Sequence, residues 1–104
     1  MSENRRIATR HPVAIPATLV VAGAKITCTL SNLSLGGAFL DTERVPMGAS
    51  VHLSFKLPGH DDVIETQSTV RWSTQEGIGV QFDGLRARDV WALNRFFEQL
   101  RSSQ

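Results

Sequence analysis

Segments in which apolar and polar residues alternate one by one recur along most of this chain, and this pattern limits the folds open to it. The clearest segment runs from Val51 to Leu57, where four apolar side chains fall on one side and three polar side chains on the other. Side chains of a β-strand point alternately to its two faces, so a period of two predicts a strand with one buried face. Turn sequences such as Ala22-Gly23-Ala24 and Pro58-Gly59 separate the segments, which predicts strands joined by short turns.

Six segments follow this pattern and are expected to form strands. They cover residues 13–21, 25–31, 38–40, 51–57, 63–73 and 77–82. In the second segment Cys28 shares a face with Ile26 and Leu30, which predicts that its thiol is buried. In the fifth segment the phase of Trp72 matches that of Val70, so packing in the core is the favoured interpretation for this tryptophan.

The period changes in the last part of the chain. Apolar residues there are spaced three or four apart, as in an amphipathic helix: Val90, Leu93, Phe97 and Leu100. We therefore expect a helix over residues 85–101, with Asp83 or Gly84 capping its start. Trp91 and Phe96 lie beside this stripe, so they either widen the packed face or face a partner. The elements favour an all-β fold, a six-stranded antiparallel β-barrel closed at one end by a C-terminal helix, because closure leaves no exposed edge strand.

The size of the chain and its single cysteine exclude several classes of protein. At 104 residues the chain has room for one domain, which excludes an enzyme with a cleft between two domains. Cys28 is the only cysteine, so neither an internal disulfide nor a cysteine-based metal site can form. No apolar run approaches the roughly 18 residues that a membrane-spanning helix needs, and the first residues lack the apolar core of a signal peptide. We therefore expect a cytoplasmic protein.

Positive charge is concentrated before the first expected strand. Residues 1–12 hold three arginines and one glutamate, a local charge of +2, whereas residues 13–104 hold eight basic and nine acidic groups. A guanidinium group grips phosphate oxygens or guanine edges with two parallel hydrogen bonds, so these arginines suit a small anionic ligand. A frayed, solvated tail is the alternative. We expect residues 1–12 to form a flexible arm and residues 13–101 to form the barrel with its helix.

Two short motifs are not required by packing. One is Arg6-Ile7-Ala8-Thr9-Arg10, preceded by Arg5, and the other is Asn32-Leu33-Ser34-Leu35-Gly36-Gly37. Their order and spacing, together with Val70-Arg71-Trp72 and residues 77–82, resemble the PilZ domain family, whose pattern is an Arg-x-x-x-Arg arm followed by an Asp/Asn-x-Ser-x-x-Gly turn. The resemblance spans nearly the whole chain. It implies a six-stranded barrel that binds the bacterial second messenger cyclic di-GMP.

The resemblance also implies a set of ligand-binding residues: Arg5, Arg6, Arg10, Asn32, Ser34, Gly36 and Gly37. Arg6 and Arg10 would pair with phosphate oxygens or with O6 and N7 of a guanine. Family members with an arginine just before the arm motif tend to hold two stacked ligand molecules, so Arg5 favours a ligand dimer. Arg71 and Trp72 are second-tier candidates for stacking on a guanine. No cofactor is expected besides this ligand.

The second motif would contact the ligand through polar atoms and bare backbone. Asn32 would accept a hydrogen bond from a guanine, and Ser34 would add a hydroxyl contact. In family members with aspartate at this position the acceptor is charged, so the neutral Asn32 should weaken binding by about 1 kcal/mol relative to them. Gly36 and Gly37 would let the backbone turn at positive φ and admit a flat ligand. An ordinary β-bulge is the alternative for the glycine pair.

The favoured function is a receptor without catalytic activity, in which the arm folds over cyclic di-GMP and a partner protein reads the new surface. The alternative is a PilZ-like adaptor that binds proteins without ligand, through the helix with Trp91 and Phe96. A nucleic-acid polymer fits poorly, because the chain beyond the arm has a net charge of −1. Ser34 lacks a glycine-flanked elbow and a His/Asp pair, so nucleophilic catalysis has no support. His60-Asp61-Asp62 is typical of a solvated turn rather than a metal site.

Overall fold

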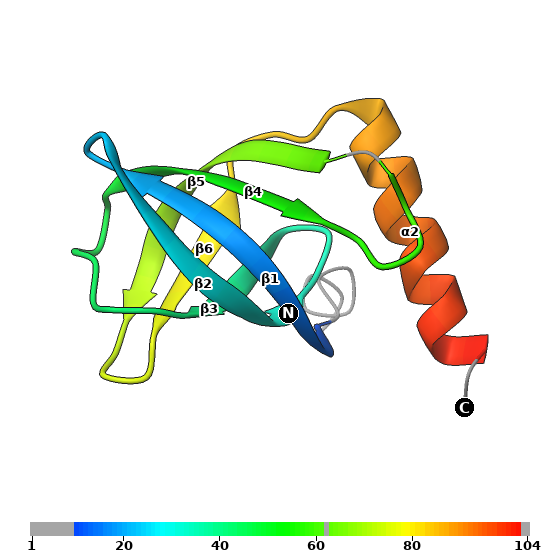
Figure 1. Cartoon of the computed structure of the whole chain (residues 1–104), viewed down its shortest axis with the longest axis horizontal. Helices are drawn as coiled ribbons and strands as arrows, with labels where there is room; N and C mark the ends of the chain where they lie inside the picture. Colours follow the sequence, from blue (N-terminus) through cyan, green and yellow to red (C-terminus); the bar gives the residue numbers. More distant parts are fainter. Residues whose placement is uncertain (1–9, 62, 103–104) are drawn as a thin grey trace, which may run out of the picture.

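Six antiparallel strands form a closed barrel in the computed structural model, which describes residues 10–61 and 63–102 (Figure 1). The strands are β1 (His11–Val21), β2 (Ala24–Leu33), β3 (Gly37–Asp41), β4 (Ser50–Lys56), β5 (Val63–Ser73) and β6 (Ile78–Phe82). Their order around the barrel is β1-β2-β3-β6-β5-β4, and the pairing of β1 with β4 completes the ring. The six expected strands and the expected barrel are confirmed.

Apolar side chains from the inner strand faces fill the barrel. The completely buried ones include Leu19, Leu30, Leu40, Leu53 and Ile78, each 0% exposed. Cys28 is buried among them, as its phase predicts. Burial, with a smaller contribution from the negative charge of Asp41, raises the pKa of the Cys28 thiol above its ordinary value.

Trp72 lies on the outer wall of the barrel, and this corrects its expected place in the core. The pairing of β5 with β6 shifts register between Val70, which lies opposite Val80, and Trp72, which lies opposite Gly79. Arg71 is therefore an additional residue in β5. One inserted residue moves the side chains after it to the opposite face of a sheet, so Trp72 points outward and is 54% exposed.

A second bulge carries β2 further than the sequence pattern indicates. The expected strand ends at residue 31, but β2 continues to Leu33 and includes Asn32. Its pairing with β3 shifts register between Leu30 and Asn32. Asn32 is therefore part of a strand. The turn between β2 and β3 spans residues 34–37, is closed by a hydrogen bond from the Ser34 N–H to the Gly37 carbonyl at 2.8 Å, and ends on Gly37, the first residue of β3.

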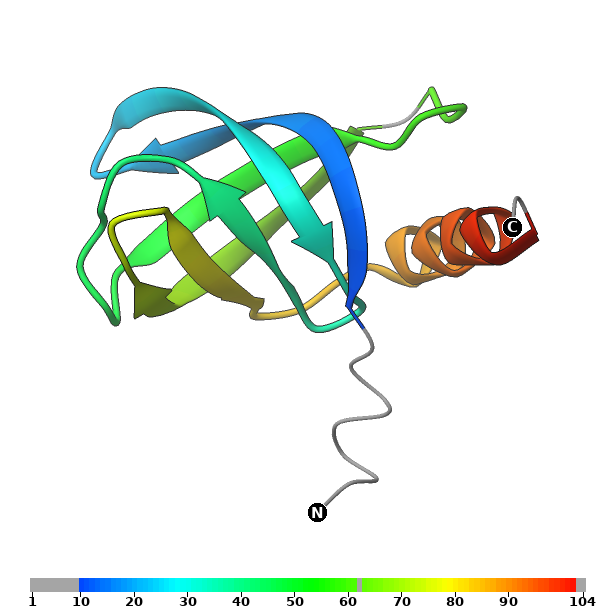
Figure 2. The same cartoon turned by 90° about the horizontal axis from the view of Figure 1, so that it is seen from below.

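The helix α2 (Ala87–Ser102) lies beside one end of the barrel, as Figures 1 and 2 show. Leu93, Phe96 and Phe97 are buried in the common core, so Phe96 widens the packed face of the helix. Trp91 is 61% exposed, so it does not widen the packed face and is accessible at the surface of the helix. Within the described part of the chain, no helix is long and apolar enough to cross a membrane.

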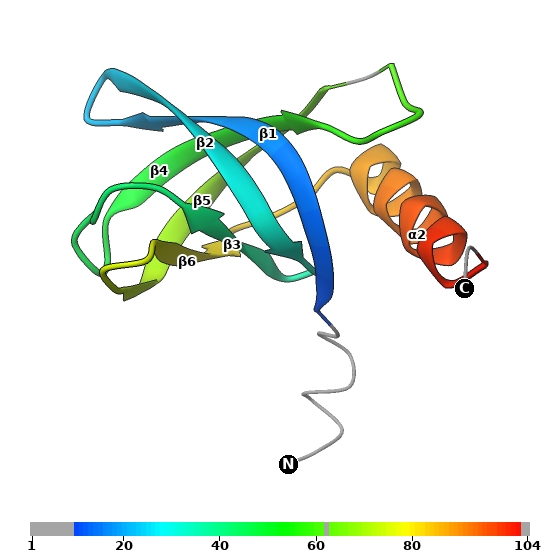
Figure 3. The same cartoon turned by 60° about the horizontal axis from the view of Figure 1, so that its bottom comes forward.

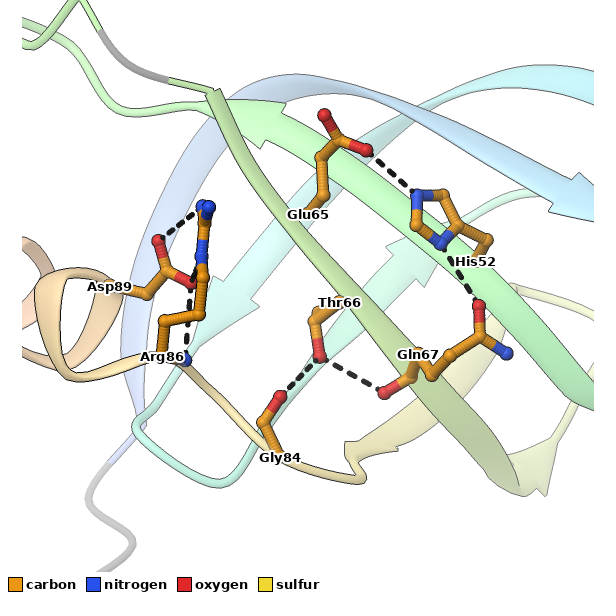
Figure 4. A network of polar contacts seen from close by, with 7 residues as sticks. All are labelled: His52, Glu65, Thr66, Gln67, Gly84, Arg86 and Asp89. Atoms are coloured by element: carbon orange, nitrogen blue, oxygen red, sulfur yellow. Dashed lines mark hydrogen bonds and ion pairs between the residues drawn. The ribbon is translucent and has the colours of Figure 1, made fainter.

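The start of α2 is capped by Asp89 rather than by Asp83 or Gly84 (Figure 4). The Asp89 carboxylate accepts the backbone N–H of Arg86 at 3.3 Å and two hydrogen bonds from its guanidinium, at 2.9 and 3.0 Å. The two expected caps instead tie the connecting segment to β5. The Gly84 carbonyl accepts the Thr66 hydroxyl at 3.1 Å, and the Asp83 carboxylate accepts the Thr69 hydroxyl at 2.9 Å.

Candidate functional site

A hollow of about 270 Å³ on the outer wall of the barrel brings Arg10, the last residue of the first motif, next to residues of the second motif. It is lined by Arg10, Ser34, Gly36, Gly37, Trp72, Val80 and Gln81. Arg10 comes from the end of the arm, and the serine and glycines come from the turn between β2 and β3. Figure 3 shows β3 between β2 and β6, the arrangement that sets this turn next to the outer wall of β6. Arg5 and Arg6 lie outside the described residues.

The Ser34 hydroxyl holds the turn between β2 and β3 in shape. It accepts the backbone N–H groups of Gly36 and Gly37, both at 3.1 Å, and donates to the Gly37 carbonyl at 3.2 Å. A hydroxyl has one proton to donate and two lone pairs, so these three bonds use its whole capacity. Ser34 is also only 4% exposed. In this conformation the hydroxyl therefore shapes the turn, and its direct contact with a ligand stays a prediction.

The two glycines of the turn meet different requirements, and neither adopts the expected positive φ. A Cβ atom on Gly37 would collide with the backbone carbonyl oxygen of Val80, because β3 and β6 approach closely there. A Cβ atom on Gly36 would have no neighbour within 4 Å. Gly37 therefore permits the strand pairing, whereas Gly36 leaves the edge of the hollow bare.

Trp72 forms an aromatic wall of the hollow. A Cβ atom on Gly79 would lie 2.8 Å from Cε3 of the indole, so the ring packs directly against the bare backbone of β6. The Cζ atom of Arg10 lies 5.5 Å from the ring centroid, within the range of a cation–π interaction. The last arginine of the arm motif is thus held against the barrel wall by this tryptophan.

Asn32 lies in the same lateral row of the outer wall as Trp72. The strand register aligns one residue from each of five strands: Pro12, Asn32, Phe39, Gly79 and Trp72. Asn32 does not line the hollow itself. Its Oδ1 atom is buried and accepts no hydrogen bond from the described residues. An unpaired buried acceptor costs about 1–3 kcal/mol, so a donor at this position would be stabilising.

Gln81 is a lining residue that the sequence pattern did not single out. It lies opposite Gly37 on β3 and Thr69 on β5, and it is exposed. Its carboxamide offers both a donor and an acceptor beside the bare glycine backbone. The sequence signal for it is its outward phase between the inward Val80 and Phe82, whereas its place opposite Gly37 depends on the strand register.

Other candidates stay apart from the hollow. Arg71 is exposed at the bulge of β5 but is not among the lining residues. Among the described residues, no cluster of His, Cys, Asp and Glu side chains has the arrangement of a metal site.

Comparison with known proteins gives one family and several related folds. The family model described as PilZ domain matches residues 4–99. The chain is similar to the Bacillus subtilis inhibitor of motility MotI/DgrA, with 20% sequence identity and a TM-score of 0.82 over 93% of this chain and 51% of that one. It is also similar to PlzA of Borreliella burgdorferi, whose structure was solved in complex with c-di-GMP. That match has 20% identity and a TM-score of 0.73 over 92% of this chain and 42% of PlzA.

A third solved structure is the PilZ domain of CeSA from a cellulose-synthesizing bacterium. The identity is 18% and the TM-score 0.68, over 90% of this chain and 99% of that domain. The TM-scores of these three matches establish a shared fold. The chain spans about half the length of MotI/DgrA, at 51%. No curated protein matches the chain in sequence.

Proposed function

Because the chain belongs to the PilZ domain family, we propose that it is a cytoplasmic receptor for cyclic di-GMP with no catalytic step of its own. In this proposal the N-terminal arm orders over the ligand at the outer hollow, and a partner protein recognises the ordered surface. An order change of this kind gives a partner two distinct surfaces to distinguish. The complex of PlzA with c-di-GMP supports the choice of ligand within the shared fold.

The observation that carries the proposal is the convergence of Arg10, the Gly36-Gly37 turn and Trp72 on one hollow. Cyclic di-GMP has two phosphates and two guanines. The Arg10 guanidinium can hold a phosphate or the O6 and N7 edge of a guanine, and the Trp72 indole can stack on a guanine face. The bare backbone at Gly36 lets a flat base approach without meeting a side chain.

Two amide side chains can add hydrogen bonds to the guanines. Oδ1 of Asn32 lacks a donor among the described residues, and a guanine offers donors at N1–H and at its exocyclic amine. The exposed carboxamide of Gln81 can pair with either type of base group. Ser34 acts indirectly, because its hydroxyl holds the turn that carries both glycines.

The arm is expected to supply the rest of the binding surface. The hollow lies on the outer wall, and Arg10, Gly36, Trp72 and Gln81 are all exposed there. In the proposal Arg6 binds a second phosphate or base, and Arg5 favours a stacked pair of ligands.

Isothermal titration calorimetry with cyclic di-GMP tests the proposal. We expect binding by the wild-type chain, and a loss of affinity of at least about tenfold, from lost charge-assisted or stacking contacts, in Arg10→Ala and in Trp72→Ala. Trp91→Ala, which removes the other exposed tryptophan, is the matched control and should bind normally. Cyclic di-AMP should bind more weakly because it lacks the guanine edges.

Calorimetry also distinguishes the alternatives. A stoichiometry of two ligands per chain, reduced to one in Arg5→Ala, supports the stacked pair. A folded wild-type chain that gives no heat with cyclic di-GMP would remove the receptor proposal and leave the ligand-independent adaptor.

A further inference from the structure

Two consecutive residues at the root of the arm contact two different elements. The Arg10 guanidinium lies over Trp72 of β5, with 5.5 Å between Cζ and the ring centroid. The imidazole of His11 stacks on Phe97 of α2, with ring centroids 4.2 Å apart and planes inclined by 18°. Two neighbouring side chains therefore contact the barrel wall and the helix, respectively.

Phe97 is a fixed platform for this stack. It is 7% exposed, belongs to the common apolar core and contacts Phe96 with ring centroids 6.0 Å apart. His11 lies opposite Leu33 in the register of β1 and β2, at the end of the barrel where α2 packs. Within the described part of the chain, no hydrogen bond or ion pair is found at the His11 ring, so its stack on Phe97 is the side-chain contact that fixes it.

The position of Arg10 depends on this contact through the backbone. Residues 10 and 11 share a peptide bond that keeps their α-carbons about 3.8 Å apart, so the place of residue 11 limits where residue 10 can lie. Arg10 precedes the first strand residue and has no strand partner to hold it. The nearest anchors of the arm are thus both at residue 11: its pairing with Leu33 and the stack of its ring on Phe97.

We propose that His11 is a positioning residue for the ligand site, which acts through its stack on Phe97 and places Arg10 against Trp72. The helix α2 is then part of the binding apparatus, although none of the side chains described in it lines the hollow. Because coupling between two sites is reciprocal, a partner that displaces α2 lowers the affinity for the ligand, and the bound ligand in turn stabilises α2 in its packed position. The effect on the ligand rests on the proposed function, whereas the placement of Arg10 does not.

The first test needs no ligand. In a Trp91→Phe background, Trp72 is the only tryptophan, and acrylamide quenching of its fluorescence reports how well Arg10 covers it. His11→Ala should raise the quenching constant of Trp72, because Arg10 loses its anchor. His11→Phe keeps an aromatic ring and should restore the wild-type constant. His60→Ala removes another half-buried histidine, beside the first turns of α2, and should change nothing.

The second test measures cyclic di-GMP affinity in the same variants. Since an aromatic stack contributes a factor of about three to ten, His11→Ala should lower affinity by that factor, and His11→Phe should not. Phe97→Leu, which keeps an apolar side chain in the core, should lower affinity as much as His11→Ala. The double variant should lose no more than either single one, because both changes remove the same stack.

The outcomes separate the two claims. Unchanged quenching and unchanged affinity in His11→Ala would overturn the positioning role, and so would equal losses in His11→Ala and His11→Phe. If the wild-type chain binds no cyclic di-GMP, the proposed function fails, and the quenching data alone decide whether His11 places Arg10.

Discussion

Gly36 and Gly37 are neighbours in one turn, yet a methyl group at each position would meet very different surroundings. At Gly37 it would collide with the Val80 carbonyl oxygen, and at Gly36 it would face open space. Gly37→Ala should therefore lower the free energy of unfolding by about 1–3 kcal/mol, a cost typical of overpacking. Gly36→Ala should change it by less than about 0.5 kcal/mol.

Urea unfolding followed by circular dichroism measures both glycine variants. Equal stabilities for the two would contradict the close approach of β3 and β6. The same pair of variants separates stability from binding, because a methyl group at Gly36 crowds the hollow without straining the barrel. We therefore expect Gly36→Ala to lower the affinity for cyclic di-GMP while it leaves the barrel intact.

Asn32 carries a buried acceptor that has no donor among the described residues, and its replacement by aspartate should change stability and binding in opposite directions. A carboxylate without a donor is more costly to bury than an amide oxygen, so Asn32→Asp should lower the free energy of unfolding by about 1–3 kcal/mol. The charged acceptor should bind guanine donors more tightly, by about 1 kcal/mol or about fivefold. Asn94→Asp, on the exposed side of α2, is the control. Lower affinity in Asn32→Asp would contradict a guanine contact at this atom.

The Cys28 thiol links stability to pH. Burial and the nearby Asp41 carboxylate raise its pKa in the folded chain above the ordinary value of 9.0. The unfolded chain therefore releases the thiol proton first as the pH rises. The stability associated with the neutral thiol is complete below about pH 9 and falls above it.

Unfolding midpoints at pH 8 and pH 10 measure this effect. The wild-type chain should lose more stability over this interval than Cys28→Ala, which has no thiol to titrate. The chain contains no tyrosine, so no phenol titrates in the same interval. An identical pH dependence for the two chains would contradict the raised pKa.

At the scale of elements, polar contacts that differ in burial hold the connection between β6 and α2, and Figure 4 shows those of Gly84 and Asp89. Asp89 is 3% exposed and both caps the helix and pairs with Arg86. Asp89→Ala should lower the free energy of unfolding by about 1–2 kcal/mol, the usual cost of losing a helix cap. Asp83→Ala removes one exposed bond to Thr69 and should cost less than about 0.5 kcal/mol. Thermal unfolding compares the two, and an equal loss would contradict the assignment of the cap.

Two β-bulges explain where sequence periodicity fails. Alternation predicts the inner face correctly along a strand only while the register is unbroken, as it is for Ile78, Val80 and Phe82. The bulge after Val70 turns Trp72 outward, and the bulge after Leu30 keeps Asn32 in β2. Both inserted residues depend on pairing with a neighbouring strand, which a single segment does not reveal. Of the two displaced residues, Trp72 lines the hollow and Asn32 lies in the same lateral row of the outer wall.

At the scale of the molecule, the barrel is closed and apolar side chains fill its interior. A ligand therefore has to bind to the outer wall, together with the arm and the helix that adjoin it. The sequence predicted the barrel, the helix and a site shared by the arm and the glycine turn, and Arg10 and that turn do line one hollow. It offered Trp72 only as a second-tier candidate and favoured the core for it, and it did not single out Gln81 or the stack of His11 on Phe97. These contacts depend on register and on how the helix packs. Trp91 stays exposed on α2, with the Arg95 guanidinium 5.4 Å from its ring centroid, and is a surface that a partner can contact.

Heteronuclear NMR with ¹⁵N-labelled chain tests most directly whether the arm and the glycine turn bind the same dinucleotide. During titration with cyclic di-GMP, the amide signals of Arg10, Gly36 and Gly37 and the indole N–H of Trp72 should shift together and reach saturation with one apparent Kd. Gly59, in the turn between β4 and β5, should keep its shift. Shifts confined to that turn, or the absence of any shift at the hollow at saturating ligand, would contradict the account.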